Sequence, residues 1–273
     1  MIEEKIAAEP LTRETNWSYK IMRWTKRYGL ILIVLAATAT TGLTQSERSD
    51  IKTLAQRGLS ESDSGQYEKA LHTYKEVLRL SPGLAEGYAQ LGYLYTQLSR
   101  YEEAIDACRQ AIRLKPELAE AYNNLGYVYQ LLDQPEKALE NYQRAVSLRP
   151  DYPEGLLNIG MAYARDNRFN KAIEFLKRAL RADPGFAVAH YNLGYVYTRN
   201  GQSGKAIESY RQAIMLKPDF AEAYHNLAVV YARRGDRGSA LMQYSMLRSL
   251  NGEMARHLCT VIYSGKILDA RRR

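Results

Sequence analysis

Residues 121–129 read Ala-Tyr-Asn-Asn-Leu-Gly-Tyr-Val-Tyr, and variants of this stretch return every 34 residues along the chain. A large side chain recurs at the place of Tyr122, namely at Leu54, Tyr88, Leu156, His190 and Tyr224. A small residue recurs at Gly58, Gly92, Gly126, Gly160, Gly194 and Ala228, and alanine at Ala70, Ala104, Ala138, Ala172, Ala206 and Ala240. A fixed period without insertions means that one structural unit is repeated.

Each unit has the pattern of two amphipathic helices. Tyr122, Leu125, Gly126 and Tyr129 follow the spacing i, i+3, i+4, i+7, which places them on one face of a first helix. Ala138, Tyr142 and Ala145 repeat this spacing in a second helix. The small residues predict a close approach of the two helices, with the tyrosines filling the space beside them. Proline disfavours helical geometry in the residue before it and ends the units at Pro82, Pro116, Pro150, Pro184 and Pro218.

Local signals predict where the second helices begin. Ser99 with Glu102, and Asp133 with Glu136, have the spacing of a capping box. Pro135 suits the first turn of a helix, because the missing N–H would be unpaired there in any case. We therefore expect Ser99 and Asp133 to cap the helices that follow them.

The large residue, Leu-Gly, tyrosine, alanine, aromatic, alanine and proline at these spacings resemble the tetratricopeptide repeat (TPR) family. The resemblance covers residues 51–254 and implies an all-α fold, an α-solenoid in which six helical hairpins form a right-handed superhelix. A C-terminal capping helix is expected to complete it. The predicted repeats are 51–84, 85–118, 119–152, 153–186, 187–220 and 221–254.

The two ends of the array depart from the pattern, as repeat proteins require for solubility. The first unit carries Arg57 and Glu61 where later units have apolar residues. In the last unit Gly252 replaces the closing proline, and Leu258, Val261 and Ile262 continue the register. We interpret about 255–268 as the capping helix, within a final segment 255–273 that ends in a solvated basic tail.

The net charge of +8 is unevenly distributed. The second and third repeats are net negative, whereas the fourth to sixth are net positive. No face has the dense Lys/Arg stripe that nucleic-acid binding requires, so we expect no nucleic-acid partner.

The N-terminal residues differ from the repeats. Residues 1–28 form a basic leader, and residues 29–45 are uncharged and just long enough to span a bilayer. The positive-inside rule predicts a single-pass membrane protein with a cytoplasmic N-terminus and the repeats on the opposite, periplasmic or lumenal, side. Two alternatives stay open: a signal peptide cleaved near Ala39, followed by export, and a soluble helix packed on the array.

The resemblance implies that the first helices line a concave groove, into which the residue two before each glycine points. That residue is an amide at Gln56, Gln90, Asn124, Asn158, Asn192 and Asn226. Amides both donate and accept, so such a ladder can hold the backbone of an extended peptide. The alternative is that asparagine simply suits a solvated helix face in this family.

Other side chains favour the binding interpretation. Tyr93, Tyr127, Met161 and Tyr195 lie one residue after the glycines, and Arg165, Arg199 and Arg233 form a basic row one turn further on. We therefore predict a protein or peptide partner with acidic residues near one end. The lysine and second asparagine of the TPR clamp for C-terminal carboxylates are missing.

The sequence contains no catalytic motif, no metal-ligand spacing and no cofactor fingerprint. Glu86, Glu120, Glu154 and Glu222 begin first helices, where a carboxylate favours the helix dipole. We expect no enzymatic activity, no cofactor and no metal. The favoured function is a membrane-tethered adaptor that binds a peptide segment in its groove and assembles or recruits a membrane-associated complex. The alternatives are a self-associating scaffold that coats a membrane, and an accessory subunit.

Overall fold

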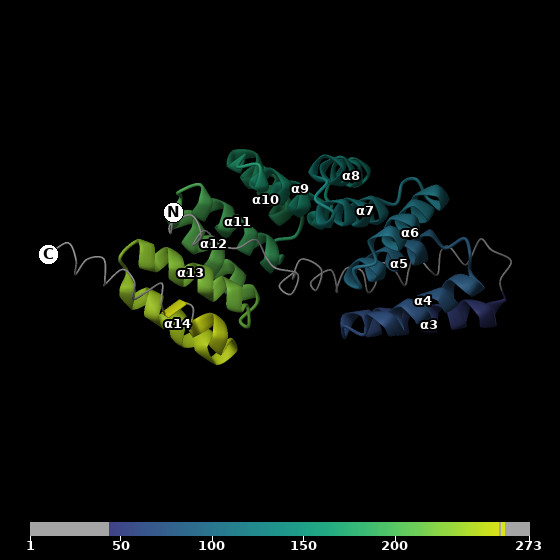
Figure 1. The fold of residues 1–273 in the computed structure, drawn as a ribbon, viewed down its shortest axis with the longest axis horizontal. Helices are drawn as coiled ribbons and strands as arrows, with labels where there is room; N and C mark the ends of the chain where they lie inside the picture. Colours follow the sequence, from purple (N-terminus) through teal and green to yellow (C-terminus); the bar gives the residue numbers. More distant parts are fainter. Residues whose placement is uncertain (1–43, 257, 260–273) are drawn as a thin grey trace. The chain divides into compact units, whose positions relative to one another are not determined.

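The computed structural model describes residues 44–256, 258 and 259, and every regular element in them is helical (Figure 1). These residues fall into two compact units that divide between Ile159 and Gly160. The helices of residues 44–159 are α3 (Gln45–Asp63), α4 (Tyr67–Leu80), α5 (Ala85–Gln97), α6 (Tyr101–Leu114), α7 (Ala119–Leu131) and α8 (Pro135–Leu148). Helix α9 (Pro153–Arg165) runs across the division. Then follow α10 (Phe169–Ala182), α11 (Ala187–Arg199), α12 (Ser203–Leu216), α13 (Ala221–Arg233) and α14 (Arg237–Leu250).

From α3 to α8, and again from α10 to α14, each helix packs against the next one in the chain. The closest pairs are α3 with α4, α5 with α6 and α7 with α8 in the first unit, and α11 with α12 and α13 with α14 in the second. First helices also contact each other, α5 with α7 and α11 with α13. This consecutive packing of helical hairpins is typical of an α-solenoid and confirms the predicted all-α fold class.

The close approach inside a hairpin depends on glycine. A Cβ added at Gly126 would lie 2.8 Å from two ring carbons of Tyr142 and 3.0 Å from the carbonyl oxygen of Ala138. Gly194 is packed in the same way against Tyr210, again at 2.8 Å. Both tyrosines are fully buried, so the ring of the second helix takes the space that the missing side chain leaves.

The turn inside each hairpin has one conformation, which the sequence interpretation missed. Residues 65, 99, 133, 167, 201 and 235, again 34 apart, all have positive φ between 54° and 80°. The next residue donates its N–H back across the helix end, as from Gln134 to the carbonyl of Tyr129 at 2.9 Å. This is the Schellman arrangement, which satisfies the last carbonyls of the first helix.

The predicted capping boxes at Ser99 and Asp133 are therefore wrong. Both residues adopt the left-handed conformation just beyond the preceding helix, and α6 and α8 have Arg100 and Gln134 as N-caps without a side-chain hydrogen bond. Pro135 does begin α8, as predicted. A capping box forms instead at Thr44, whose hydroxyl accepts from the backbone N–H of Glu47 at 3.2 Å.

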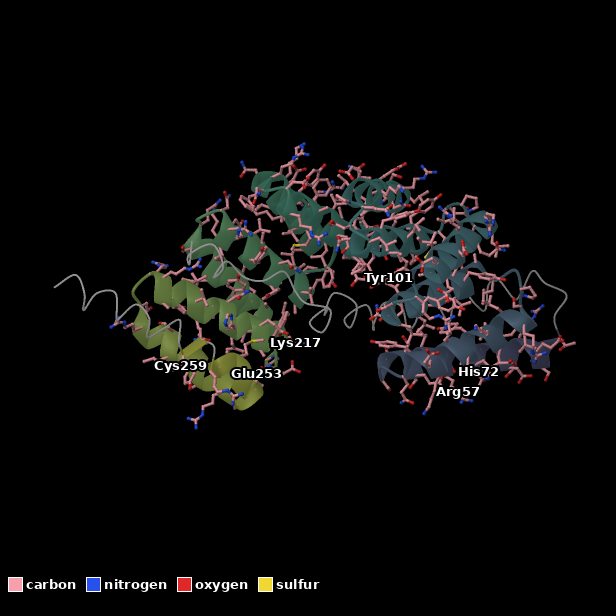
Figure 2. All side chains as sticks on the ribbon, viewed as in Figure 1. Arg57, His72, Tyr101, Lys217, Glu253 and Cys259 are labelled. Carbon is pink, nitrogen blue, oxygen red and sulfur yellow. The ribbon has the colours of Figure 1, made fainter. Side chains whose placement is uncertain are left out.

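The described chain has a polar N-terminal end, at α3, and a C-terminal end that is partly covered by the residues after α14. Arg57 forms an ion pair with Glu61 at 2.8 Å on α3, and Arg57 and His72 lie at the surface (Figure 2). Past α14 the chain is helical again from Gly252, with Ala255 and Leu258 buried. Val261, Ile262 and the rest of the predicted cap and tail lie outside the described residues.

None of the helices in residues 44–256 combines the length and the apolar character needed to cross a bilayer. The predicted membrane or signal segment, residues 29–45, lies outside the described part of the chain except for Thr44 and Gln45. The leader 1–28 lies outside it entirely.

Candidate partner-binding surface

Two amides of the predicted ladder, Asn124 and Asn158, are engaged within the protein in residues 44–159, whereas Gln56 is exposed. Asn124 is 2% exposed, and its Nδ2 donates to the carbonyl oxygen of Ala89 on the preceding first helix at 3.0 Å. Asn158 donates from Nδ2 to Oδ1 of Asn123 at 2.9 Å, again between neighbouring first helices. Gln90 is buried. Asn124 and Asn158 therefore hold successive first helices in register.

In residues 160–259 one amide bonds within its own helix and another joins two first helices. Asn192 is buried, and its Nδ2 donates to the carbonyl oxygen of Val188 in its own helix at 2.9 Å. Asn226 is partly exposed and donates to the hydroxyl of Tyr191 at 3.0 Å, joining α13 to α11. His225 lies beside it, with Nδ1 3.2 Å from Oδ1 of Asn226.

The aromatic positions also differ in exposure. Tyr127 is buried, whereas Tyr93 and Tyr195 are partly exposed. Burial, together with the nearby Tyr67 and Tyr127, raises the pKa of the Tyr93 hydroxyl well above its usual range. Tyr93 packs against the buried core of its unit, and both Tyr93 and Tyr195 keep part of their surface exposed.

The arginine row is the most accessible part of the predicted site. Arg165, Arg199 and Arg233 are exposed residues that end α9, α11 and α13. In the described part of the chain, no carboxylate forms an ion pair with any of them. All three lie in residues 160–259, where fifteen Lys and Arg face eight Asp and Glu.

Arg199 is held in place by neutral groups. Its Nη1 donates to the hydroxyl of Tyr195 at 3.0 Å, and its Nη2 donates to Oδ1 of Asn167 at 3.1 Å. The guanidinium carbon lies 5.7 Å from the ring centroid of Phe169 and 6.0 Å from that of Tyr195. The cation thus lies near two aromatic rings and pairs with no carboxylate of the described residues. A guanidinium has five N–H donors.

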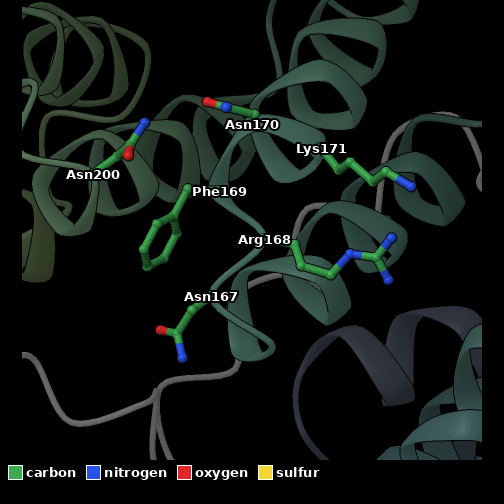
Figure 3. A pocket seen from close by; sticks show the side chains of 6 residues that line it. All are labelled: Asn167, Arg168, Phe169, Asn170, Lys171 and Asn200. Carbon is green, nitrogen blue, oxygen red and sulfur yellow. The ribbon is translucent and has the colours of Figure 1, made fainter.

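A hollow of about 220 Å³ opens beside this cluster. Asn167, Phe169 and Asn200 lie on one side of the turn before α10, whereas Arg168 and Lys171 extend to the other side (Figure 3). Arg168 and Lys171 also flank the buried ring of Tyr163, at 4.7 and 5.5 Å from its centroid. The lining is polar and cationic, with one aromatic ring.

Sequence reasoning missed the residues of this hollow because they belong to turns and not to the repeated helix faces. Asn167 takes the left-handed turn position that is glycine in three other repeats. That register was visible in the sequence as Gly65, Gly201 and Gly235, and it could have identified Asn167 as a turn residue. Its contact with Arg199, 32 residues away, could not be read from spacing within one repeat.

The predicted glutamates begin their helices, and two of them form ion pairs within their own repeat. Glu86 and Glu120 lie in the first turns of α5 and α7. Lys115 and Arg149 reach them at 2.9 and 2.7 Å, and the hydrogen bond to Glu86 raises the pKa of Lys115. Within residues 44–256 no cluster of His, Cys, Asp or Glu has the arrangement of a metal site.

Paired helices repeated at a fixed period, with a charged surface and no catalytic constellation among the described residues, define a helical-repeat interaction scaffold. Family models agree. Models described as "Tetratricopeptide repeat" match residues 117–185 and 175–208, and one described as "TPR repeat" matches 58–99, 92–133 and 195–235. The chain belongs to the tetratricopeptide repeat family, whose members are generally non-enzymatic interaction scaffolds.

Solved structures are similar over most of the repeats. MamA is 28% identical, with 61% of this chain and 97% of that chain covered and a TM-score of 0.53. A thermophilic TPR protein from Thermus thermophilus is 26% identical, with coverages of 65% and 98% and a TM-score of 0.56. PilW, a type IV pilus biogenesis factor, shares the fold at 23% identity, with coverages of 81% and 100% and a TM-score of 0.66. No curated protein matches the chain.

Proposed function

We propose that this protein is a membrane-tethered adaptor whose first-helix face binds an extended, acidic segment of a partner protein. The observation that carries the proposal is the row formed by Arg165, Arg199 and Arg233, which is exposed and lacks a carboxylate partner among the described residues. An acidic segment would supply the missing charges, and charge-assisted hydrogen bonds are stronger than neutral ones.

Arg199 is the central contact in this proposal. Tyr195 and Asn167 each accept one of its hydrogen bonds. The side chain is therefore already ordered in the free protein, and binding a ligand costs less conformational entropy. Its remaining N–H groups are available to a carboxylate of the partner. The Tyr195 ring and the hollow beside Phe169 would receive neighbouring side chains.

The amide ladder takes a different part in the proposed site. Gln90, Asn124 and Asn192 are buried, so we assign them to positioning the first helices. Asn158 and Asn226 are partly exposed and remain candidates for direct contact with a partner backbone. Of the aromatic residues predicted in residues 44–159, Tyr93 is partly exposed and could contribute to the surface, whereas Tyr127 is buried.

Residues 29–45 would tether this binding surface to a membrane. The uncharged segment after a basic leader supports that assignment, with the repeats on the periplasmic or lumenal side. A tethered adaptor would concentrate its partner at the membrane and so act in the assembly or recruitment of a membrane-associated complex. Export after cleavage is the alternative for this segment.

The test is photo-crosslinking from position 195 of the full chain in its own cells, with p-benzoylphenylalanine replacing Tyr195. We expect a defined partner that is lost when Arg165, Arg199 and Arg233 are all changed to glutamate. The control is Arg181→Glu, at an exposed arginine on α10 outside the row. A crosslinked partner that the triple variant retains, or that Arg181→Glu also loses, would contradict the proposed site.

A self-associating scaffold remains the second candidate function. One observation favours it, the outer face of α14.

A further inference from the structure

The outer face of α14 differs from that of every other second helix. Its residues 242, 245, 246 and 249 are Met, Ser, Met and Ser, spaced i, i+3, i+4, i+7. At the first of these places the other second helices carry a histidine or an acid, namely His72, Asp106, Glu140, Glu174 and Glu208. At the second they carry Lys75, Arg109, Gln143, Lys177 and Arg211. We name residues 242, 245, 246 and 249 the α14 stripe.

The stripe is exposed and uncharged. Met242 is 66% and Met246 46% exposed, and Leu241 and Leu250 at its borders are 39% and 40% exposed. Helix α14 contains no acidic residue, and its basic residues, Arg237 and Arg248, lie off the stripe. A neutral stripe with apolar borders on an otherwise charged array indicates an interface.

The serines are prepared for burial. The hydroxyl of Ser245 donates to the carbonyl oxygen of Met242 at 2.8 Å, and that of Ser249 donates to the carbonyl oxygen of Met246 at 2.7 Å. The main penalty for burying a hydroxyl is a proton left without an acceptor. Because both protons are already paired, covering these serines would not incur that penalty. Small side chains between methionines also suit close contact with another helix better than insertion into lipid, where serine gains nothing.

We propose that the α14 stripe binds the α14 stripe of a second copy, with the two helices antiparallel about a two-fold axis between Ser245 and Met246. In that arrangement each methionine comes level with a serine of the second copy, because 242 and 249, like 245 and 246, lie equally far from the axis. Large side chains thus meet small ones. Arg248 comes level with Gln243 of the second copy, so no pair of arginines is brought together.

The contact would be weak. The stripe extends about 10 Å along the helix and covers less than the roughly 800 Å² per partner of a standard interface. Such a dimer forms mainly where the protein is concentrated, as it would be on a membrane. The inference goes beyond the proposed peptide binding and uses residues separate from the arginine row.

The test uses charge complementation on the full chain. Ser245→Arg with Met246→Arg copies the basic pair of α10, Lys177 and Arg178, so the monomer should tolerate it. A second variant carries Ser245→Glu and Met246→Glu. The control is Gln143→Arg, which creates the same basic pair on α8 beside Arg144.

Sedimentation velocity in a mild detergent, over about a hundredfold range of concentration, would measure the dimer. We expect the wild type and Gln143→Arg to dimerise equally, each charged variant alone to dimerise at least about tenfold more weakly, and their equimolar mixture to recover the dimer. A monomeric wild type, charged variants that still dimerise alone, or a mixture that stays monomeric would overturn the proposal. A dimer that appears only after deletion of residues 260–273 would mean that this segment covers the α14 stripe in the full chain, which would also overturn the proposal. Loss of the dimer with crosslinking from position 195 intact would leave the proposed function standing.

Discussion

Replacing Asn158 by alanine is expected to destabilise the protein because it removes the hydrogen-bond partner of a second residue, Asn123. Asn158 supplies the hydrogen bond to Oδ1 of Asn123, whose side chain is completely buried. The Nδ2 of Asn123 has no partner among the described residues. After the substitution, both ends of a buried amide would lack a partner.

The expected cost follows from that geometry. Leaving a buried acceptor unpaired costs about 1–3 kcal/mol, and alanine recovers about 0.5 kcal/mol through its better helix propensity. We therefore expect Asn158→Ala to lower the free energy of unfolding by about 0.5–2.5 kcal/mol. Asn141→Ala is the matched control, because Asn141 bonds only to the backbone of its own helix at an exposed site; its effect should stay within about 0.5 kcal/mol.

The partner residue provides a second check. Alanine occupies the place of Asn123 in the first two repeats, at Ala55 and Ala89, so Asn123→Ala is compatible with the fold. Combined with Asn158→Ala it removes the buried amide altogether. The double variant should be more stable than the sum of the single effects predicts, by about 1 kcal/mol.

Urea unfolding of the full chain, followed by circular dichroism at 222 nm, measures these differences. The reasoning is refuted if Asn158→Ala costs no more than Asn141→Ala, or if the two substitutions at 123 and 158 are additive. Either result would mean that the amide pair does not stabilise the contact between neighbouring first helices.

Two further predictions concern packing and burial. Gly126→Ala should destabilise the protein by about 1–3 kcal/mol, because the added Cβ would overlap the Tyr142 ring. Gly204→Ala should stabilise it by up to about 1 kcal/mol, because a Cβ added there would meet no neighbouring atom within 4 Å. Thermal unfolding of both variants measures the difference, and equal effects would contradict the prediction. Burial raises the pKa of the Cys108 thiol from 9.0 to about 12, so at pH 8 a thiol reagent should modify the partly exposed Cys259 and leave Cys108 intact until the protein unfolds. The folded state holds this proton more tightly than the unfolded state, so the contribution of Cys108 to stability is complete below pH 9 and is lost as the pH rises toward 12. Modification of Cys108 at the same rate as Cys259 at pH 8 would disprove its burial.

The helices, their order and their pairing could be predicted from the sequence because each depends on contacts inside one 34-residue unit. Tyr122, Leu125, Gly126 and Tyr129 define a helix face by spacing alone, and Gly126 predicted the close approach of the second helix that Tyr142 then makes. The first helices of the second to sixth repeats keep the period, with starts at Ala85, Ala119, Pro153, Ala187 and Ala221, whereas α3 begins earlier, at Gln45. The predicted caps at Ser99 and Asp133 failed, because a short pattern does not distinguish the start of one helix from the end of another.

The candidate site was predicted less completely. The arginine row is exposed as expected, because the end of a first helix has few neighbours to cover it. The amides of Asn124 and Asn158 were expected to face a ligand, yet they bond to Ala89 and Asn123 of the preceding repeat. Whether an amide meets a ligand or a neighbouring helix depends on how closely successive repeats stack, and a pattern confined to one repeat does not contain that distance.

By itself the sequence determined the repeat, the all-helical fold and the uneven charge, since spacing, small residues and composition act over one or two helical turns. Only the tertiary structure decided which polar side chains are consumed in holding repeats together and which remain at the surface. Burial depends on several repeats at once, so Asn124 and Asn192 are covered, whereas Arg199, near two aromatic rings, and Met242 and Met246 stay exposed.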